Sequence, residues 1–255
     1  MTGGNGSKQA RSGAPARNLP ARFYTAVAVE AATPVGLRIL LDGRPIRTPA
    51  KAQFAVPTQA LAEAVAEEWR AQVAIIDPVS MPLTALCNTA IDGIRGREAQ
   101  IRAEIAGYGA SDLVCYRAET PDELVRRQAQ AWDGVLAWAR DTLGVRLATS
   151  SGVMPVRQPD EAVTAVARAL EAYDAFGLCA LHLMTALMGS ALLALAHVHD
   201  RLTVAEAWAA AHVDEDWQIA KWGEDAEAAA RRARRWGEME AASRLLALLR
   251  RPGPG

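Results

Sequence analysis

The sequence predicts an α+β protein that is mainly α, with a small β-rich N-terminal domain followed by a larger helical domain. Residues 22 to about 57 show β-type patterns: residues 23–29 alternate β-branched or aromatic residues with small ones, and a hairpin turn signal follows. From Thr58 onward, apolar residues recur at spacings of three and four, which is typical of packed helices. The chain has 255 residues, 51% of them apolar, and this is enough for a sizeable core.

The N-terminal region is expected to form short antiparallel strands. Residues 23–29 and 37–41 fit the first two strands, and Asp42-Gly43 is a strong signal for a tight turn into a returning strand at 44–48. Residues 53–56 would add another short strand. Because proline cannot donate a backbone hydrogen bond, the prolines of this region limit the strands to short or edge positions.

The first helix is expected to begin after Thr58, an N-cap residue. Its apolar face has a spacing of four: Leu61, Val65 and Trp69. A connector with two X-Pro pairs, at 77–78 and 81–82, leads to a long stripe that predicts one helix continuing through Gly93 and Gly96. The stripe consists of Cys87, Ile91, Ile94, Ile101, Ile105 and Tyr108.

The middle of the chain predicts two further helices. Residues 120–123 read as a capping box with Pro121 at the first helical position. The helix that follows carries Leu124, Trp132, Val135 and Trp138 on its apolar face. Residues 149–159 are rich in Ser, Gly and Pro and predict a loop or short strands, and a helix is expected over 160–173.

The segment between Asp174 and Asp200 contains no charged residue apart from its histidines. Its length would suffice for a membrane span. However, it contains His182, Thr185 and His197, and it lacks a basic flank. We therefore interpret it as one fully buried central helix surrounded by amphipathic helices.

The C-terminal part predicts two more helices. Thr203 and Glu206 form a capping box, preceded by Leu202 as a hydrophobic staple, and the helix they open is expected to run through Trp222. The last helix is expected over 225–249.

From these patterns we expect the chain to be organised in four parts. Residues 1–21, which are basic and dominated by Gly, Pro, Ser and Ala, are expected to be a disordered tail. Residues 22–80 would form the β-rich N-terminal domain with a connecting helix, and residues 81–250 the helical C-terminal domain. Residues 251–255 are expected to be frayed.

Composition excludes several classes of function. The net charge of −1 gives no global field for nucleic acid or an anionic membrane. The widely spaced cysteines at 87, 115 and 179 have apolar neighbours and predict buried thiols in a reducing compartment. No apolar run marks a secretory signal. The bacterial cytoplasm is the expected location, with the mitochondrial matrix as the alternative.

No sequence motif indicates catalysis, nucleotide binding or metal binding. There is no Gly-x-Ser-x-Gly string, no Walker-type phosphate loop and no Gly-x-Gly-x-x-Gly fingerprint. His197 and His199 would diverge by about 200° on a helix, and no cysteine or carboxylate cluster completes a metal site with them. We therefore expect no cofactor, no metal and no enzymatic activity.

Residues 214–225 combine acidic side chains with two tryptophans and carry the main candidate site. On a helix continuing from Thr203, Glu215 falls within a mostly apolar stripe, which also contains Trp208, His212, Ile219 and Trp222. A buried carboxylate is costly unless it is paired. Glu215 must therefore have a partner, hold a proton or face another molecule.

Each candidate side chain has a purely structural alternative. Glu215 could pair within the chain with Arg231, Arg235 or Arg117. Trp217, roughly 160° from Glu215 around a helix, could contact a partner or pack against another helix. The core is the default place for Trp69, Trp208 and Trp222. The basic run 231–235 could hold a phosphate or the acidic string, although a solvated face is the more common role.

Five strings occur together and in order. They are Leu-Leu-Asp-Gly-Arg-Pro-Ile-Arg-Thr-Pro (40–49), Glu-Glu-Trp-Arg-Ala-Gln (67–72), Met-Pro-Leu-Thr-Ala-Leu-Cys-Asn-Thr-Ala-Ile-Asp (81–92), Ser-Asp-Leu-Val-Cys-Tyr-Arg-Ala (111–118) and Asp-Glu-Asp-Trp-Gln-Ile-Ala-Lys-Trp-Gly (214–223). In this order they resemble the assembly chaperones of the F-type ATP synthase that bind its alpha subunit. The resemblance covers roughly residues 20–250.

The resemblance implies a soluble chaperone that holds the unassembled alpha subunit until the beta subunit replaces it. Because one subunit is handed over, we expect a monomer, and the charge balance predicts no nucleic-acid partner and no membrane insertion. It also implies that an acidic residue of the 214–216 string is important for function. Glu215 is the first choice, and Asp214 and Asp216 share the prediction, with Trp217 as a neighbouring contact. Two other classes stay open: an enzyme of unknown type using Glu215 and His212, and a structural interaction protein of another complex.

Overall fold

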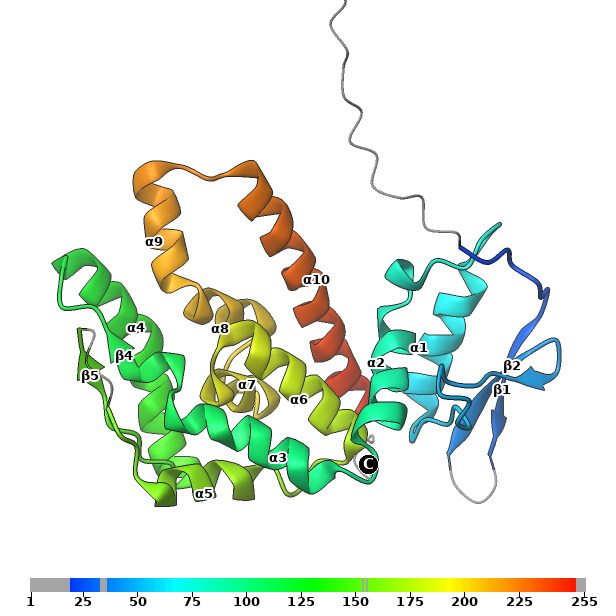
Figure 1. The fold of residues 1–255 in the computed structure, drawn as a ribbon, viewed down its shortest axis with the longest axis horizontal. Helices are drawn as coiled ribbons and strands as arrows, with labels where there is room; N and C mark the ends of the chain where they lie inside the picture. The colour runs from blue at the N-terminus through cyan, green and yellow to red at the C-terminus, as the bar shows by residue number, and fades with distance from the viewer. Residues whose placement is uncertain (1–18, 33–35, 153, 155, 251–255) are drawn as a thin grey trace, which may run out of the picture.

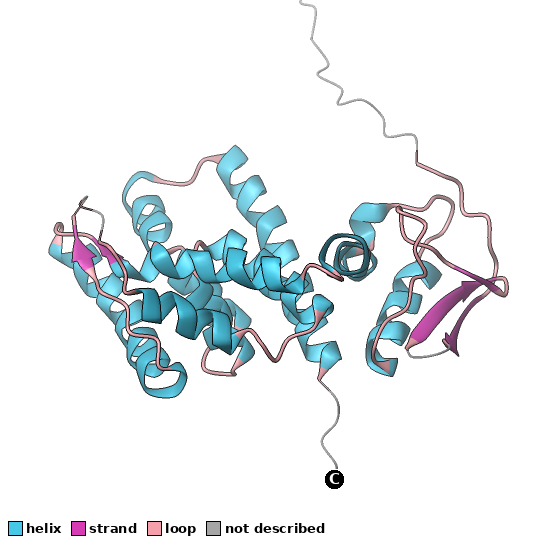
Figure 2. Ribbon diagram, turned by 60° about the horizontal axis from the view of Figure 1, so that its bottom comes forward, coloured by secondary structure: helices cyan, strands magenta, loops and turns pink. Residues whose placement is uncertain are grey.

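The computed structural model describes residues 19–32, 36–152, 154 and 156–250. It confirms the predicted class, because a small sheet lies at one end and helices make up most of the rest, with one short pair of strands at the other end (Figures 1 and 2). The strands are β1 (Val27–Ala31), β2 (Leu37–Leu41), β3 (Arg44–Pro45), β4 (Tyr116–Arg117) and β5 (Ser150–Ser151). The helices are α1 (Gln59–Arg70), α2 (Pro82–Thr89), α3 (Glu98–Gly107), α4 (Asp122–Trp138), α5 (Asp160–Ala169), α6 (Ala175–Met188), α7 (Ala191–Val198), α8 (Val204–Ala211), α9 (Val213–Trp222) and α10 (Ala226–Leu249).

The N-terminal sheet is antiparallel in the order β1-β2-β3. Its hairpin turn is the predicted Asp42-Gly43, and both residues have positive φ values, 48° and 78°. The Asp42 carboxylate accepts hydrogen bonds from the backbone N–H groups of Ala26 and Thr25, and these bonds lower its pKa. The first strand was predicted too early, since this side-chain bonding replaces strand pairing before Val27. Residues 53–56 contribute only isolated bridges.

Residues 20–24 are fixed against the end of α1. Ala21 and Ile75 form an antiparallel bridge, and the Ile76 N–H donates to the Pro20 carbonyl, so residues 20 and 21 of the expected tail are paired. Residues 1–18 and 251–255 lie outside the described residues. Tyr24 points inward and donates its hydroxyl proton to the Trp69 carbonyl at 2.7 Å. The neighbouring Phe23 points outward and is 72% exposed.

A buried carboxylate joins α1 to α2. Thr58 caps α1 as predicted, because its hydroxyl accepts from the Leu61 N–H. At the other end of this helix, Glu68 is 8% exposed and accepts from the N–H groups of Leu83 and Thr84, at 2.7 and 2.8 Å. The Thr84 hydroxyl donates to the same carboxylate at 2.7 Å. Glu68 therefore caps the start of α2 from a different helix.

Two predicted helices are interrupted. The stripe from Cys87 to Tyr108 is divided between α2 with a wide π turn (Ala90–Ile94) and α3, and the chain turns at Gly96 with φ +82°. The apolar segment forms α6 and α7 rather than one helix, because Gly189 takes φ +66° and the Ser190 side chain caps α7. Both halves are buried, as expected, and form the centre of the core.

Two predictions about caps had different outcomes. The capping box of Thr203 and Glu206 is confirmed at the start of α8. The one over residues 120–123 is wrong, because Pro121 itself is the N-cap, with extended backbone, and no side chain caps α4. The short parallel pair β4–β5 confirms the expectation of short strands near residue 150.

The three cysteines are free and buried, as predicted. Burial raises the pKa of the Cys115 and Cys179 thiols to about 12 and raises that of Cys87 as well. Within the described part of the chain, no helix combines the length and apolar character that a membrane crossing needs.

Candidate partner-binding site

The acidic string does not continue the α8 helix. The helix ends at His212, and α9 begins in a new direction at Val213, so that α9 and α10 form an arch over α8 (Figure 1). This break invalidates the single stripe predicted from Trp208 to Trp222. Trp208 is buried as expected, but Trp222 is 73% exposed, which corrects its assignment to the core. None of the α9 residues is buried.

The three carboxylates occupy the first turn of α9, where the helix dipole favours negative charge. Asp214 accepts a hydrogen bond from the Gln128 side chain of α4 at 2.7 Å. Asp216 pairs on the other side with Arg232 of α10 at 2.5 Å. The two aspartates thus tie the start of α9 to the helices on either side of it.

Glu215 is held far less closely. Its carboxylate lies 4.0 Å from Arg232 and 4.0 Å from His212, and its side chain is 40% exposed. The predicted burial of Glu215 is therefore wrong. The expected internal cation exists, but it is Arg232 rather than Arg231, Arg235 or Arg117, and it is bound closely by Asp216 instead.

His212 is a structural residue at the joint between α8 and α9. Its Nδ1 lies 2.7 Å from the Trp208 carbonyl and must donate to it, and its ring stacks on the Trp208 ring at 3.9 Å between centroids. Burial lowers the pKa of His212. Because 4.0 Å to Glu215 exceeds the reach of a hydrogen bond, this geometry does not favour an acid–base pair.

Trp217 faces α4 and is half-buried. Its indole Nε1 is buried without a complete hydrogen bond, although the Glu123 carboxylate is close. The pKa of Glu123 is lowered by Lys221 and, to a smaller extent, by Trp217. Trp222 packs against Trp217 edge to face, with ring centroids 5.4 Å apart. Trp222 is therefore the solvent-accessible tryptophan of α9, and it packs on the half-buried Trp217 ring.

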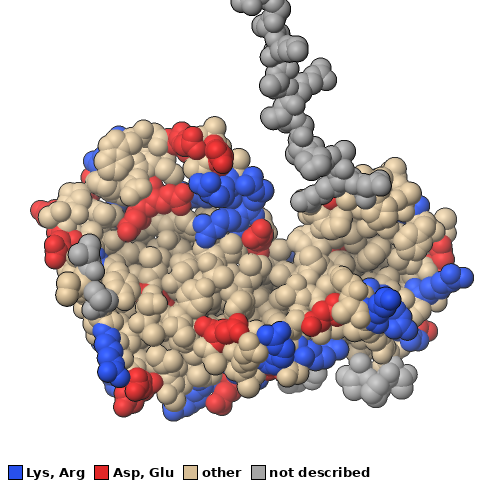
Figure 3. All heavy atoms as spheres, in the orientation of Figure 1, with Lys and Arg blue, Asp and Glu red and all other residues tan. Residues whose placement is uncertain are grey.

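The basic run of α10 is divided between two directions. Arg232 turns toward α9, and Arg235 donates to the Leu187 carbonyl at the end of α6 at 2.5 Å. Arg231 and Arg234 are exposed. Figure 3 shows the result, with acidic groups over α9 beside basic groups over the first turns of α10. Arg232 of the run thus binds the acidic string, whereas Arg231 and Arg234 face solvent.

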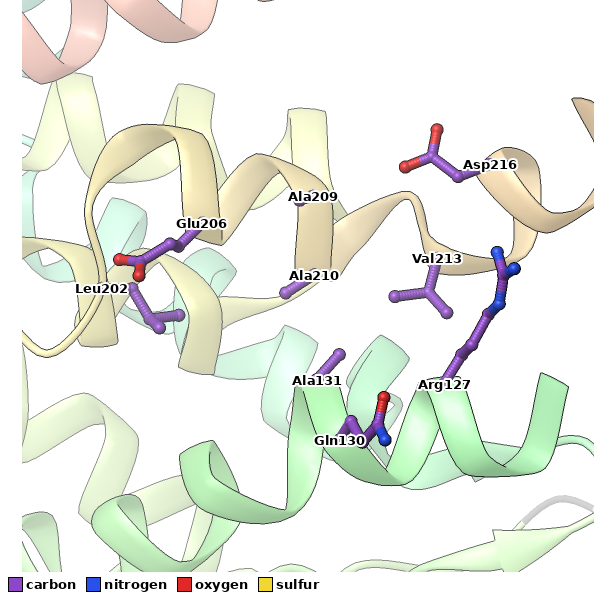
Figure 4. Close-up of a pocket in the computed structure, with 9 residues that line it drawn as sticks. All are labelled: Arg127, Gln130, Ala131, Leu202, Glu206, Ala209, Ala210, Val213 and Asp216. Carbon is purple, nitrogen blue, oxygen red and sulfur yellow. The ribbon is translucent and has the colours of Figure 1, made fainter. Parts of the chain in front are cut away.

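A groove lies beside this string, between α4 and the α8–α9 joint (Figure 4). Val213 and Asp216 border it, and its volume is about 460 Å³. Neither Glu215 nor His212 lines it. In the described residues, no three His, Cys, Asp or Glu side chains converge in a way that would hold a metal ion.

Sequence reasoning missed two carboxylates that are truly buried, Glu68 and Asp112. A signal existed for Glu68, which lies seven residues after Leu61 and so on the same helical face. A signal for Asp112 is its place as an N-cap before three apolar residues, 113–115. Both have structural roles and belong to the interior.

Known proteins share this architecture over nearly the whole chain. The structure of Atp12 from Paracoccus denitrificans is 39% identical, with a TM-score of 0.86, and the match covers 91% of this chain and 99% of that one. The chain belongs to the ATP12 chaperone family. The family's sequence profile, ATP12 chaperone protein, matches residues 21–140.

Two further structures agree with this membership. A mutant of the Paracoccus Atp12p with lysine in place of an aspartate is 38% identical, with a TM-score of 0.87 and coverage of 91% and 98%. Atu1473 of Agrobacterium tumefaciens, described as a candidate chaperone, is 48% identical, with a TM-score of 0.88 and coverage of 91% and 87%. The resemblance inferred from five strings is thus confirmed, and this ATP12-family member has a chaperone role.

Proposed function

We propose that this ATP12-family protein binds the unassembled alpha subunit of the F-type ATP synthase and shields its subunit interface until the beta subunit replaces it. The proposed contact surface is the start of α9, with Glu215 at its centre and Asp214, Asp216 and Trp217 around it. The exposed Trp222 extends this surface. The protein acts by covering a partner, with no reaction of its own.

The observation that carries the proposal is the incomplete pairing of Glu215. Its neighbouring groups, the Arg232 guanidinium and the His212 imidazole, are each 4.0 Å away, whereas the closest contacts of Asp214 and Asp216 are 2.7 and 2.5 Å. A basic group of a partner could approach Glu215 to about 2.8 Å, a typical distance for a charge-assisted hydrogen bond. An exposed tryptophan on the same helix supplies the kind of side chain that often anchors interfaces.

The role agrees with the physics of an obligate assembly. A subunit built for a large permanent interface exposes apolar surface while it is alone, and such surface aggregates. A chaperone for it needs a complementary surface that binds less stably than the final partner. We propose that the protein does this in the bacterial cytoplasm, since the matched structures come from bacteria. We propose a monomer, because a chaperone that hands over a single subunit needs only one binding surface.

The first test is aggregation of purified alpha subunit, followed by light scattering. We expect this protein to suppress aggregation at a near-equal molar ratio without ATP, because holding an exposed surface needs no nucleotide. Aggregation that proceeds unchanged with a correctly folded protein would show that the proposal is wrong.

The variant Glu215→Gln should weaken binding to the alpha subunit by about ten- to a hundredfold, because a charged hydrogen bond contributes roughly 1.5–3 kcal/mol. Its melting temperature should stay that of the wild type, since the residue is half-exposed. Titration calorimetry and thermal unfolding measure the two quantities. Glu224→Gln, at an exposed position after α9, is the matched control and should bind normally.

If Glu215→Gln lowered the melting temperature instead of the affinity, Glu215 would have a structural role within the arch. A large fall in melting temperature would mean that its long contacts with Arg232 and His212 stabilise the fold. Wild-type affinity with wild-type stability would remove Glu215 from the contact surface.

A further inference from the structure

The groove between α4 and the α8–α9 joint has an apolar floor made of small side chains. Figure 4 shows Ala131 on α4 opposite Ala209 and Ala210 on α8, with Val213 continuing the floor toward α9. Ala209 is exposed, and Ala131 and Val213 are half-buried, so apolar surface faces solvent along the groove. Short side chains on two neighbouring helices leave room for the backbone of a third element to approach closely.

The floor is held in place from beneath. Trp132 of α4 is fully buried, and its indole N–H donates to the Ala210 carbonyl at 2.7 Å. This bond fastens α8 to α4 directly under the groove. The groove is therefore a fixed feature of the fold, ready to accept a partner without rearrangement.

The two edges of the groove differ in charge. The α8–α9 edge carries Glu206 and Asp216, while the α4 edge carries Arg127 and Gln130 (Figure 4). Asp216 is paired with Arg232 and Arg127 with Glu123, so the charge difference rests on Glu206. The pKa of Glu206 is lowered by hydrogen bonds from Thr203, so its carboxylate is ionised at neutral pH. Both bonds use Oε2, which leaves Oε1 without a partner among the described residues.

We infer that this groove binds an amphipathic helix of the alpha subunit, the client of this chaperone, and that the helix lies between α4 and α8. Small or medium apolar residues of that helix would face the alanines, and basic residues would lie on the flank next to Glu206. The inference rests on the proposed function, because the groove is continuous with its surface through Val213 and Asp216. Helix-in-groove docking uses apolar anchors spaced by three and four residues, and an alanine floor admits them.

Filling the groove is the direct test. Ala209→Phe places a large side chain on the floor at an exposed position, and affinity for the alpha subunit should fall at least tenfold with an unchanged melting temperature. Ala103→Phe is the control, because Ala103 is an exposed alanine in the middle of α3 and does not line the groove. Wild-type affinity for Ala209→Phe would overturn the inference.

The acidic edge has its own test. Glu206→Gln keeps an acceptor for the capping box but removes the charge. We expect about threefold weaker binding and a smaller loss of affinity when salt is raised. An unchanged salt dependence would contradict the assignment of a basic flank to the client helix.

The failure of this inference can be told from failure of the proposed function. If Glu215→Gln loses affinity while Ala209→Phe does not, the α9 surface stands and the groove is excluded. If the wild type does not bind the alpha subunit, the proposed function and the groove inference are both wrong. A photoreactive residue at position 209 should crosslink to a helical client segment containing Lys or Arg, and a crosslink to an acidic or non-helical segment would also exclude the helix.

Discussion

Replacing Glu68 by alanine should lower the free energy of unfolding by about 3–5 kcal/mol, because each buried donor that loses its acceptor costs about 1–3 kcal/mol. Three donors are affected: the N–H groups of Leu83 and Thr84 and the Thr84 hydroxyl. The carboxylate is 8% exposed, so water replaces it poorly. Urea unfolding followed by circular dichroism at neutral pH measures the change.

The preceding residue provides the control. Glu67 pairs with Arg70 at the surface with its own side chain 66% exposed, and Glu67→Ala should change stability little. Glu68→Gln should fall between the two, since an amide keeps one acceptor oxygen but turns a donor toward an N–H group. Equal losses for Glu67→Ala and Glu68→Ala would mean that the trans-helix cap contributes nothing specific.

The Glu68 cap explains why two of the five strings accompany each other. Residues 67–72 supply the carboxylate, and residues 81–92 supply the helix start that it caps. Asp42 of the first string closes the hairpin, and Asp112 of the fourth is buried. Four strings therefore encode the fold, and only the string at 214–223 lies on a helix without buried residues.

The sequence predicted the fold best where local pattern decides it, although the capping box over residues 120–123 was wrong. The hairpin turn, the Thr58 cap and the Thr203 capping box depend on neighbouring residues and were correct. The interruptions at Gly96, Gly189 and His212 were missed. A period of three to four residues continues across a short break, and tertiary contacts determine whether the chain turns there.

The candidate site was predicted in composition but not in geometry. The helix break before Val213 changes the direction of α9, and so Glu215 and Trp222 leave the face of Trp208. Which arginine lies near the acids depends on the angle between α9 and α10, and no local pattern contains that angle. The groove needs α4 and α8 side by side, which is equally a long-range property.

The stability of this protein should also depend on pH through Asp112. This carboxylate is fully buried, and burial raises its pKa to about 6, although hydrogen bonds from Ser190, Leu192, Val114 and Ala191 favour its ionised form. It fastens the turn before β4 to the start of α7, since it accepts from the Val114 and Leu192 N–H groups at 3.3 and 3.1 Å.

The direction in which stability changes with pH follows from proton binding. In the unfolded chain this carboxyl titrates near 3.8, so between that pH and about 6 the folded state binds more protons. The stabilisation is therefore complete below the unfolded pKa and is lost as pH rises to about 6. A shift of about two units corresponds to about 3 kcal/mol of unfolding free energy between pH 4 and pH 7.

The variant Asp112→Asn removes this titration, and its difference from the wild type isolates the effect. At pH 4 the wild type should exceed the variant by the most, because the protonated carboxyl has no burial penalty while the amide turns a donor toward backbone N–H groups. This advantage should shrink by about 3 kcal/mol at pH 7, as measured by urea unfolding at both pH values. Asp42→Asn is the control, since hydrogen bonds lower the pKa of Asp42 and its difference from the wild type should not shrink over this range. A constant difference for Asp112→Asn would mean that this carboxylate keeps its charge at pH 4 and that the four hydrogen bonds outweigh its burial.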